Sequence, residues 1–443
     1  MLTRRCLIST LLSAIAFAQM QAADAQSASP PFPHLGAILV GGDIDFVNVA
    51  HIGNVQAAIF TVYPGYNVGG KTFAQQVTAV KALNPNIKIT GQTNIMELAS
   101  YEKVSTDAHY PEYVAVNTNN WWLRTSYPGG SIVTDTFGAS AINIMSPNLT
   151  GTGQTYRQWQ AAWTVSFSTK LAPNVDGVNT DNFFYAPRDS GDYLQNGTSQ
   201  SASAVAQNWR NAYADWVTQL RAAMGPGYMA WGNVADWRSG SIQGYNQVLN
   251  GGVFEGAIGM SWSPESSSWA TLMSAYATDM NALAPFNGGG PYLIFNQDGS
   301  LSDYQGVRYG LASCLLDNGY FYYTPGPYNT IGWFDEFTVN LGAPVAGPNN
   351  PTNGTYSNGG LTVWQNGVWR RDFTNGIALV NPKGNGPQTV TLETTYKHFS
   401  GTQDPSVNNG QSVTTVTLND RDGVILLRVN AQPVPDAPTL TVQ

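Results

Sequence analysis

Eight short apolar runs, spread over the first three quarters of the chain, constrain the fold most strongly. They are rich in β-branched and aromatic residues, and continuous apolar runs of this kind are typical of strands buried on both faces of a parallel sheet. The runs comprise residues 37–40, 57–62, 87–91, 177–181, 228–233, 252–258, 291–296 and 319–323. With 443 residues, 42% of them hydrophobic, the chain can bury a core of the size that such a sheet needs.

Amphipathic stretches separate several of these runs. Apolar side chains recur at helical spacing in each stretch, for example Trp209, Tyr213 and Trp216. The stretches comprise residues 72–83, 156–171, 204–224, 268–283 and 304–317. Strands that alternate with helices predict an α/β fold, a (β/α)₈ TIM barrel over residues 36–341. Residues 92–176 exceed one crossover, and we expect this insertion to help build the binding face.

The remaining segments differ from the barrel pattern. Residues 342–360 are rich in Pro, Gly and Asn, which indicates a linker, and residues 361–430 show short alternating runs separated by turn signals, which predicts a small antiparallel β-sandwich. Residues 431–443 predict a disordered tail. At the other end, Arg4 and Arg5 precede a short apolar stretch and small residues, which indicates a signal peptide over 1–25, cleaved near Ala25 and followed by a linker over 26–35. We therefore expect a secreted or periplasmic bacterial protein with no membrane-spanning segment.

Composition and motifs exclude several kinds of function. The net charge is −8 and the 20 basic residues are scattered, which disfavours a nucleic-acid partner. The four histidines show no metal-ligand spacing, and no phosphate loop or GxSxG motif is present, so we expect no metal and no cofactor. The sequence does not define the oligomeric state.

Two acidic residues stand at the ends of predicted strands, where barrels carry their active sites. Asp181 ends the fourth run, and Glu255 interrupts the apolar sixth run. Alternate strands place inward side chains in a common layer, so the two carboxylates should face one cavity. Such a pair is the minimum equipment for glycoside hydrolysis. Asp176, at the opposite end of the fourth strand, is expected to be structural.

Further side chains near the predicted strand ends or in the insertion could bind a poly- or oligosaccharide. Indole rings stack on the apolar faces of sugars, whereas amide, carboxylate and guanidinium groups bond their hydroxyls. Any single aromatic residue could equally belong to the core. The candidates are Asp43, Trp121, Trp122, Arg124, Asn182, Trp231, Asn233, Trp262, Asn296, Tyr323 and Asp335.

Several short motifs, taken in order, resemble those of a bacterial family of glycoside hydrolase barrels with a C-terminal β-domain. They are the DGVNTDN segment of residues 176–182, the FEG segment of 254–256, the WFDEF segment of 333–337 and the RDFTNGIALVNP segment of 371–382. The resemblance extends distantly to alpha-galactosidase-like and polygalactosaminidase-like barrels. It implies a retaining hydrolase with Asp181 as the nucleophile and Glu255 as the acid/base. Asn179 and Thr180 depart from the family pattern, which has apolar residues there.

Two alternatives remain open at this stage. A non-catalytic carbohydrate-binding barrel would keep the aromatic groove without a working carboxylate pair. Alternatively, strand four could supply the acid/base and strand seven the nucleophile, in which case Asp298 would be the candidate. The separation of Asp181 and Glu255 distinguishes the first alternative, because more than ~10 Å would leave them unable to act together.

Overall fold

A computed structural model describes residues 31–61, 66–171, 174–225, 227–233, 245, 247–286, 290–346 and 362–429. The predicted signal peptide (1–25) and tail (431–443) lie outside the described residues, as do residues 26–30 and 347–360 of the two predicted linkers (26–35 and 342–360). Among the described residues, no helix is both long and apolar enough to span a bilayer.

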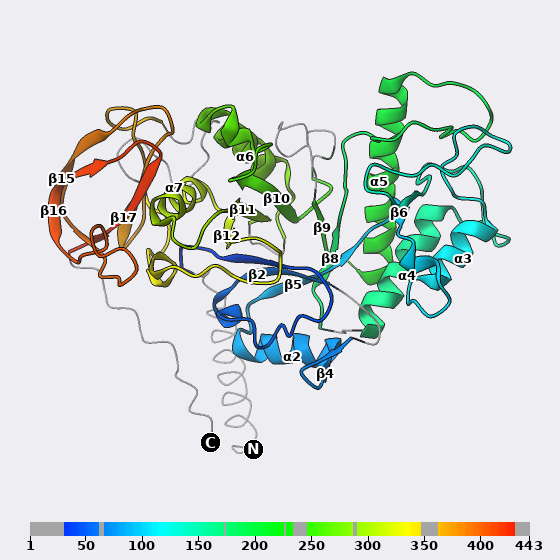
Figure 1. Cartoon of the computed structure of the whole chain (residues 1–443), viewed down its shortest axis with the longest axis horizontal. Coiled ribbons are helices and arrows are strands. Elements are labelled where there is room, and N and C mark those ends of the chain that lie inside the picture. The colour runs from blue at the N-terminus through cyan, green and yellow to red at the C-terminus, as the bar shows by residue number, and fades with distance from the viewer. Residues whose placement is uncertain are drawn as a thin grey trace, which may run out of the picture.

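Eight parallel strands form one sheet whose neighbours follow chain order (Figure 1). The strands are β1 (Gly36–Leu39), β2 (Ala57–Thr61), β5 (Lys88–Thr93), β8 (Gly177–Thr180), β9 (Met229–Asn233), β10 (Gly251–Ile258), β11 (Tyr292–Asp298) and β12 (Tyr320–Thr324). The residues before β1 close the ring, because Leu35 bridges to Phe321 and the Phe321 N–H donates to the His34 carbonyl at 2.9 Å. The predicted barrel is confirmed. Residues 32–35, predicted as linker, belong to this closure because Phe32 and Leu35 are buried.

Helices connect most of the strands. They are α2 (Phe73–Leu83), α3 (Tyr110–Thr118), α4 (Tyr156–Leu171), α5 (Ala202–Met224), α6 (Trp269–Ala282) and α7 (Tyr304–Cys314). Capping residues set their starts: Thr72 and Gln75 form a capping box on α2, and the Ser201 side chain accepts from the backbone of α5. The crossover from β1 to β2 contains only the short 3₁₀ turn Ile52–Asn54, and a small hairpin of β3 (Asn67–Val68) and β4 (Lys71–Thr72) precedes α2.

The insertion after β5 forms a separate lobe beside α5 (Figure 1). It contains α3, α4 and a two-stranded antiparallel sheet of β6 (Glu97–Leu98) and β7 (Ser140–Ala141). Polar contacts tie α4 to α5, since Arg157 pairs with Asp215 at 2.7 Å and the Trp216 indole donates to Gln160 at 2.5 Å. Buried aromatic side chains, including Trp121 and Trp122, fill its core.

Stacked aromatic rings cross the end of the barrel where the strands begin. Trp231 stacks on Tyr292, which stacks on Tyr320, and His34 continues the series. At this same end, the Lys81 ammonium pairs with the Asp176 carboxylate at 2.7 Å, and the Ile89 N–H donates to the same oxygen at 2.9 Å. The structural role predicted for Asp176 is therefore confirmed.

The C-terminal region forms a five-stranded antiparallel sheet packed against α7. Its order is β13 (Trp369–Asp372), β14 (Gly376–Asn381), β17 (Asp422–Arg428), β15 (Gln388–His398) and β16 (Ser412–Leu418). Leu379 and Leu426 of one half share a core with Val390 and Val416 of the other, so the sheet folds over on itself. Gly423 meets α7 so closely that a Cβ there would lie 2.4 Å from the Arg308 carbonyl oxygen.

Candidate active site

Asp181 and Glu255 meet at the carboxyl ends of the strands. Asp181 directly follows β8, the fourth strand, and Glu255 lies within β10, the sixth. Asn233 ends β9 between them, and its Nδ2 donates to Asp181 Oδ1 at 3.0 Å and to Glu255 Oε2 at 2.9 Å. Both oxygens lie one hydrogen bond from the same nitrogen, so they are at most about 5.9 Å apart, the sum of the two bonds. We call Asp181, Asn233 and Glu255 the amide-bridged pair.

The Asp181 carboxyl is partly buried and surrounded by donors. Besides Asn233, the Gln92 side chain donates to Oδ2 at 2.9 Å and the Asn182 backbone N–H donates to Oδ1 at 2.9 Å. Burial, followed by the nearby Glu255, raises the pKa of Asp181, and these three donors oppose that rise by favouring the carboxylate. The site therefore balances a desolvated position against hydrogen bonds that stabilise the ionised form.

The Glu255 carboxyl lies in an irregular part of β10. Gly256 has a φ of 55°, and the register with β11 shifts between Phe254 and Ile258. This bulge turns the strand at the mouth of the barrel. Tyr328, in the loop after β12, donates its hydroxyl to Glu255 Oε1 at 2.8 Å. None of the Arg and Lys side chains in the described ranges forms an ion pair with Glu255.

Trp262 packs against Gly256, the residue that follows Glu255. A Cβ on Gly256 would be 2.3 Å from the Trp262 ring, so only glycine fits beneath the indole. Trp262 is 44% exposed, and among the described residues it is the one tryptophan that counts as an exposed hydrophobic residue. Trp262 is therefore a partly exposed aromatic side chain that packs on the backbone one residue after Glu255.

β11 brings a third carboxyl to Glu255. Asp298 ends this strand, and burial together with Glu255 raises the pKa of Asp298 to about 7. Asn296, two residues earlier, is fully buried, and its Oδ1 accepts from the Gly256 N–H at 2.8 Å. The Asn296 side chain thus fixes the bulge of β10, a structural role that differs from the predicted contact with sugar hydroxyls.

Several aromatic candidates lie in the core. The indoles of Trp121 and Trp122 fill the insertion, Trp231 stacks on the floor of the barrel, and Tyr323 donates its hydroxyl to the Ser300 carbonyl. Each side chain is at most 1% exposed, so none offers a face to a sugar ring. The predicted sugar contacts of Trp121, Trp122, Trp231 and Tyr323 are therefore wrong, because burial of apolar area outweighs exposure for such large rings.

The polar candidates Asp335, Arg124 and Asp43 lie in three different parts of the molecule. Asp335 contacts the C-terminal region, where its carboxylate accepts from the backbone N–H groups of Thr402 and Gln403. Arg124 donates to the Gly130 carbonyl at 2.9 Å within the insertion. Asp43 is exposed in the loop after β1 and has a φ of 61°.

The side chains of Asn182 and Asn233 are engaged by carboxylates rather than left open. Asn182 donates to Glu97 at 3.0 Å, and Asn233 bridges the amide-bridged pair. Gln92, Tyr328 and Glu97 were absent from the sequence candidates. Gln92 directly follows the third apolar run, so its strand-end position was a usable signal, whereas no pattern marked Tyr328 or Glu97.

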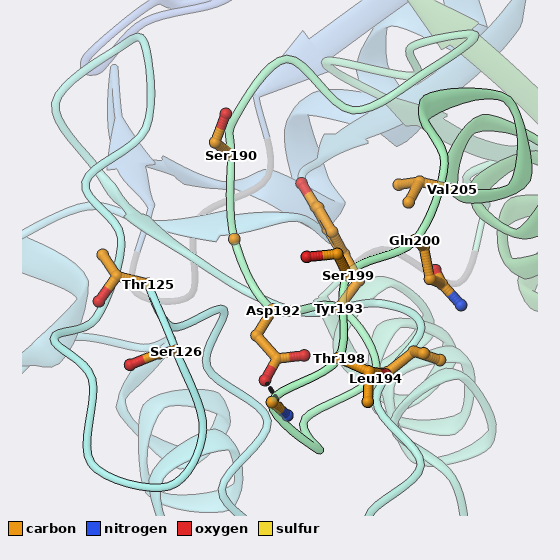
Figure 2. Close-up of a pocket in the computed structure, with 12 residues that line it drawn as sticks. Thr125, Ser126, Ser190, Asp192, Tyr193, Leu194, Thr198, Ser199, Gln200 and Val205 are labelled. Carbon is orange, nitrogen blue, oxygen red and sulfur yellow. Dashed lines mark hydrogen bonds between the residues drawn. The ribbon is translucent and has the colours of Figure 1, made fainter.

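The insertion holds a separate cavity of about 410 Å³ (Figure 2). Its walls come from the segment around Thr125 and Ser126 and from the loop after β8, where Asp192 accepts from the Gly197 N–H at 2.8 Å. Neither carboxylate of the amide-bridged pair lines this cavity. Within the described ranges, no group of three or more His, Cys, Asp or Glu side chains is placed to hold a metal ion.

The comparison with solved structures finds distant similarities to several enzymes. Among solved structures, an α-amylase from Geobacillus thermoleovorans complexed with acarbose is 10% identical with a TM-score of 0.45, over 90% of this chain and 99% of that chain. A cycloalternan-degrading enzyme from Trueperella pyogenes in complex with a covalent intermediate is 11% identical with a TM-score of 0.44, over 92% and 62% of the two chains. A family 27 β-L-arabinopyranosidase from Geobacillus stearothermophilus, in complex with arabinose, is 10% identical with a TM-score of 0.43, over 92% and 98%.

The search of curated proteins found no significant match. Residues 81–377 match the model of hypothetical glycosyl hydrolase family 15, which confirms the resemblance carried by the sequence motifs. Because the matched residues make up well over half of the chain and include both carboxylates of the amide-bridged pair, the chain belongs to hypothetical glycosyl hydrolase family 15 and is a glycoside hydrolase.

Proposed function

We propose that this protein hydrolyses O-glycosidic bonds of a poly- or oligosaccharide with net retention, using Asp181 as the nucleophile and Glu255 as the acid/base. One observation carries the proposal: a single amide nitrogen, that of Asn233, donates to both carboxylates. No metal or organic cofactor takes part in the proposed reaction.

The separation of the two carboxylates supports retention. Retaining glycosidases hold them about 5–5.5 Å apart, whereas inverting enzymes need about 6.5–9.5 Å to admit a water molecule. Asn233 holds the two oxygens that it bridges, Asp181 Oδ1 and Glu255 Oε2, within about 5.9 Å of each other, and this close approach favours the retaining arrangement. The same limit counts against a barrel that only binds sugar, since such a barrel has no need of two carboxylates within reach of each other.

The surroundings of each carboxyl support the division of roles. Asp181 receives three N–H donors, from Gln92, Asn182 and Asn233, and donors of this kind stabilise the carboxylate that must attack the anomeric carbon. Glu255 accepts hydrogen bonds from Tyr328 and Asn233, and the next residue, Gly256, packs against the exposed Trp262. In this assignment Glu255 protonates the leaving oxygen first and later activates water.

We assign sugar stacking to Trp262, because it is the candidate aromatic residue that is 44% exposed and it packs against Gly256, the residue after Glu255. The exposed Asp43 remains a candidate for bonding sugar hydroxyls, and Arg124 a candidate further out in the insertion.

We also propose export followed by cleavage near Ala25. The N-terminal sequence of the protein recovered from its native host would begin after Ala25, and an N-terminus that retains Arg4 and Arg5 would contradict this.

Screening the purified protein against a panel of polysaccharides and aryl glycosides, with product analysis, tests the proposal. The wild type should release reducing ends from at least one substrate, and the first product seen by proton NMR should keep the anomeric configuration of that substrate. An inverted first product would overturn retention. Binding without hydrolysis across the panel, or full activity in Asp181→Asn, would overturn the catalytic assignment.

A further inference from the structure

Two further carboxyls, Glu97 and Asp135, lie on the insertion side of Asp181. Glu97 begins β6, and its Oε1 accepts from Asn94 Nδ2 at 2.7 Å and from Asn182 Nδ2 at 3.0 Å. Both donors are amide groups that need an acceptor. One oxygen of Glu97 is thereby fully engaged.

Asp135 shows the same division of its oxygens. It lies in the tight turn before β7, where its Oδ1 accepts from the backbone N–H groups of Phe137 and Ala139, each at 2.8 Å. Its side chain is buried. Two backbone donors on one oxygen are an arrangement that stabilises a carboxylate.

The other oxygen of each carboxyl is buried and lacks a donor within the described ranges. Glu97 Oε2 and Asp135 Oδ2 are both buried, and neither meets an N–H or O–H donor among the described residues, although the two side chains contact each other at hydrogen-bonding range. Two carboxylates cannot form a hydrogen bond unless one of them holds a proton. One shared proton satisfies both oxygens and removes the repulsion between them. We call Glu97 and Asp135 the proton-sharing pair.

Asn182 connects this pair to Asp181. It follows Asp181 directly and has a φ of 53°, a left-handed conformation that is costly unless surrounding contacts hold it. Three contacts hold it here. Its side chain donates to Glu97 at 3.0 Å, its carbonyl accepts from the Tyr213 hydroxyl at 2.9 Å, and its backbone N–H donates to Asp181 Oδ1 at 2.9 Å.

We propose that Glu97 is a positioning residue for Asp181: it shares one proton with Asp135, remains neutral, and holds Asn182 so that its N–H stays on the Asp181 carboxylate. This inference rests on the proposed role of Asp181. A neutral Glu97 accepts the Asn182 amide without placing a second negative charge beside Asp181. The negative charge of the pair then resides on Asp135, where two backbone donors stabilise it.

The charges around Glu97 are consistent with this distribution. Asp135, Asp181 and Tyr213 face Glu97, and Asp189 faces Asp135. Burial and the contact with Asp135 raise the pKa of Glu97 to about 9. Above that pH the pair loses its proton, and the new charge on Glu97 acts against ionisation of Asp181.

Two isosteric variants separate positioning from a merely structural role. Glu97→Gln replaces the proton with a permanent N–H donor and leaves the charge on Asp135. Asp135→Asn also keeps every hydrogen bond, but the new amide donates to Glu97, which becomes the charged partner beside Asp181. We expect Glu97→Gln to keep kcat within about threefold of wild type and to leave the acid limb of kcat/KM in place, whereas Asp135→Asn raises that limb by about half a pH unit or more. Glu97→Ala, which drops Asn182, should lower kcat about tenfold to a hundredfold.

A readout without substrate keeps this inference separate from the proposed function. Infrared titration gives the ionisation of Asp181 when the spectrum of Asp181→Asn is subtracted. We expect the pKa of Asp181 to rise in Asp135→Asn and to stay unchanged in Glu97→Gln. The difference spectrum between wild type and Glu97→Gln at neutral pH should contain the C=O band of one protonated carboxyl, which belongs to Glu97. Equal Asp181 titration in both variants, or a difference spectrum without that band, would overturn the inference. These results hold whether or not a glycoside is cleaved, so failure of the proposed function alone would be recognised by absence of hydrolysis.

Discussion

The mouth of the barrel holds two carboxyl pairs that solve the same electrostatic problem differently. The amide-bridged pair of Asp181 and Glu255 is joined by an N–H donor that serves both oxygens. The proton-sharing pair of Glu97 and Asp135 has no such donor, in the part of the chain that the structure describes, for its two remaining oxygens. An amide between two carboxyls lets each keep its own protonation state, so that one can attack while the other donates a proton, whereas a shared proton leaves one carboxyl neutral and structural. The atom between two carboxyls therefore separates a reactive pair from a supporting one.

Removing either carboxylate of the amide-bridged pair should have the largest effect. We expect Asp181→Asn and Glu255→Gln each to lower kcat by about 10³-fold or more on the substrate found by screening, while circular dichroism and the unfolding midpoint stay close to wild type. Glu97→Gln is the matched control, because it makes the same carboxylate-to-amide change in the supporting pair. Similar losses in all three variants would contradict the distinction between the pairs.

Azide sharpens the assignment within the amide-bridged pair. In Glu255→Ala, azide can attack the glycosyl-enzyme intermediate and release Asp181 without help from a general base, so it should restore turnover of an activated aryl glycoside and give a glycosyl azide of retained configuration. In Asp181→Ala, azide should take the place of the missing nucleophile and give a glycosyl azide of inverted configuration, which would support Asp181 as the nucleophile. Rescue of Asp298→Ala instead would favour Asp298 of strand seven as the nucleophile.

Asn233→Ala tests the bridging amide itself. Both carboxylates would lose a donor and repel each other more strongly, so we expect kcat to fall about tenfold to a hundredfold. The acid limb of the pH profile should rise, because the pKa of Asp181 is already raised by burial and by Glu255. An unchanged pH profile in Asn233→Ala would show that the bridge does not set the ionisation of the pair.

The pH dependence of stability should distinguish the proton-sharing pair. Folding raises the pKa of Glu97 from its ordinary 4.5 to about 9, so the folded state holds a proton that the unfolded chain releases. The free energy of unfolding should therefore fall as pH rises from about 4.5 to about 9, with Glu97 contributing a slope of up to one proton. Urea titrations of wild type and Glu97→Gln at pH 5, 7 and 9 measure this. The variant should lose less stability toward pH 9, and parallel curves would contradict a proton held by Glu97.

Trp262→Ala should have the smallest effect on the chemistry. Loss of an exposed aromatic face weakens stacking by about 1–2 kcal/mol, so we expect KM to rise about tenfold with kcat changed little. Trp122→Ala is the contrasting variant, because this buried indole should cost stability instead of substrate affinity. A rise in KM confined to Trp122→Ala would reverse the assignment of the two side chains.

The sequence predicts the repetitive parts of this molecule well. All eight barrel strands and the five predicted helices occur within a few residues of their expected bounds, because apolar runs and helical spacing report burial directly. Asp181 and Glu255 could be brought together for the same reason, since the order of strands in a barrel fixes which ends are neighbours. Their common donor, Asn233, stood among the candidates only as a sugar ligand.

Contacts between loops could not be predicted in this way. Glu97 and Asp135 are far apart in the sequence and meet because the small β6–β7 sheet lies against the end of β8. Tyr328 reaches Glu255 from the loop after β12. No periodicity marks such meetings. The sugar contacts of the tryptophans could not be predicted for a related reason. Composition supplies aromatic rings but does not say which of them are buried in a core, like Trp121, and which are exposed, like Trp262.

Mapping a trapped intermediate tests the central claim most directly. An activated 2-deoxy-2-fluoro glycoside of the sugar that the enzyme cleaves should accumulate as a covalent adduct, and peptide mass spectrometry should locate that adduct on Asp181. An adduct on Asp298 or Glu255, or active hydrolysis that never yields an adduct and inverts the anomeric centre, would contradict the account.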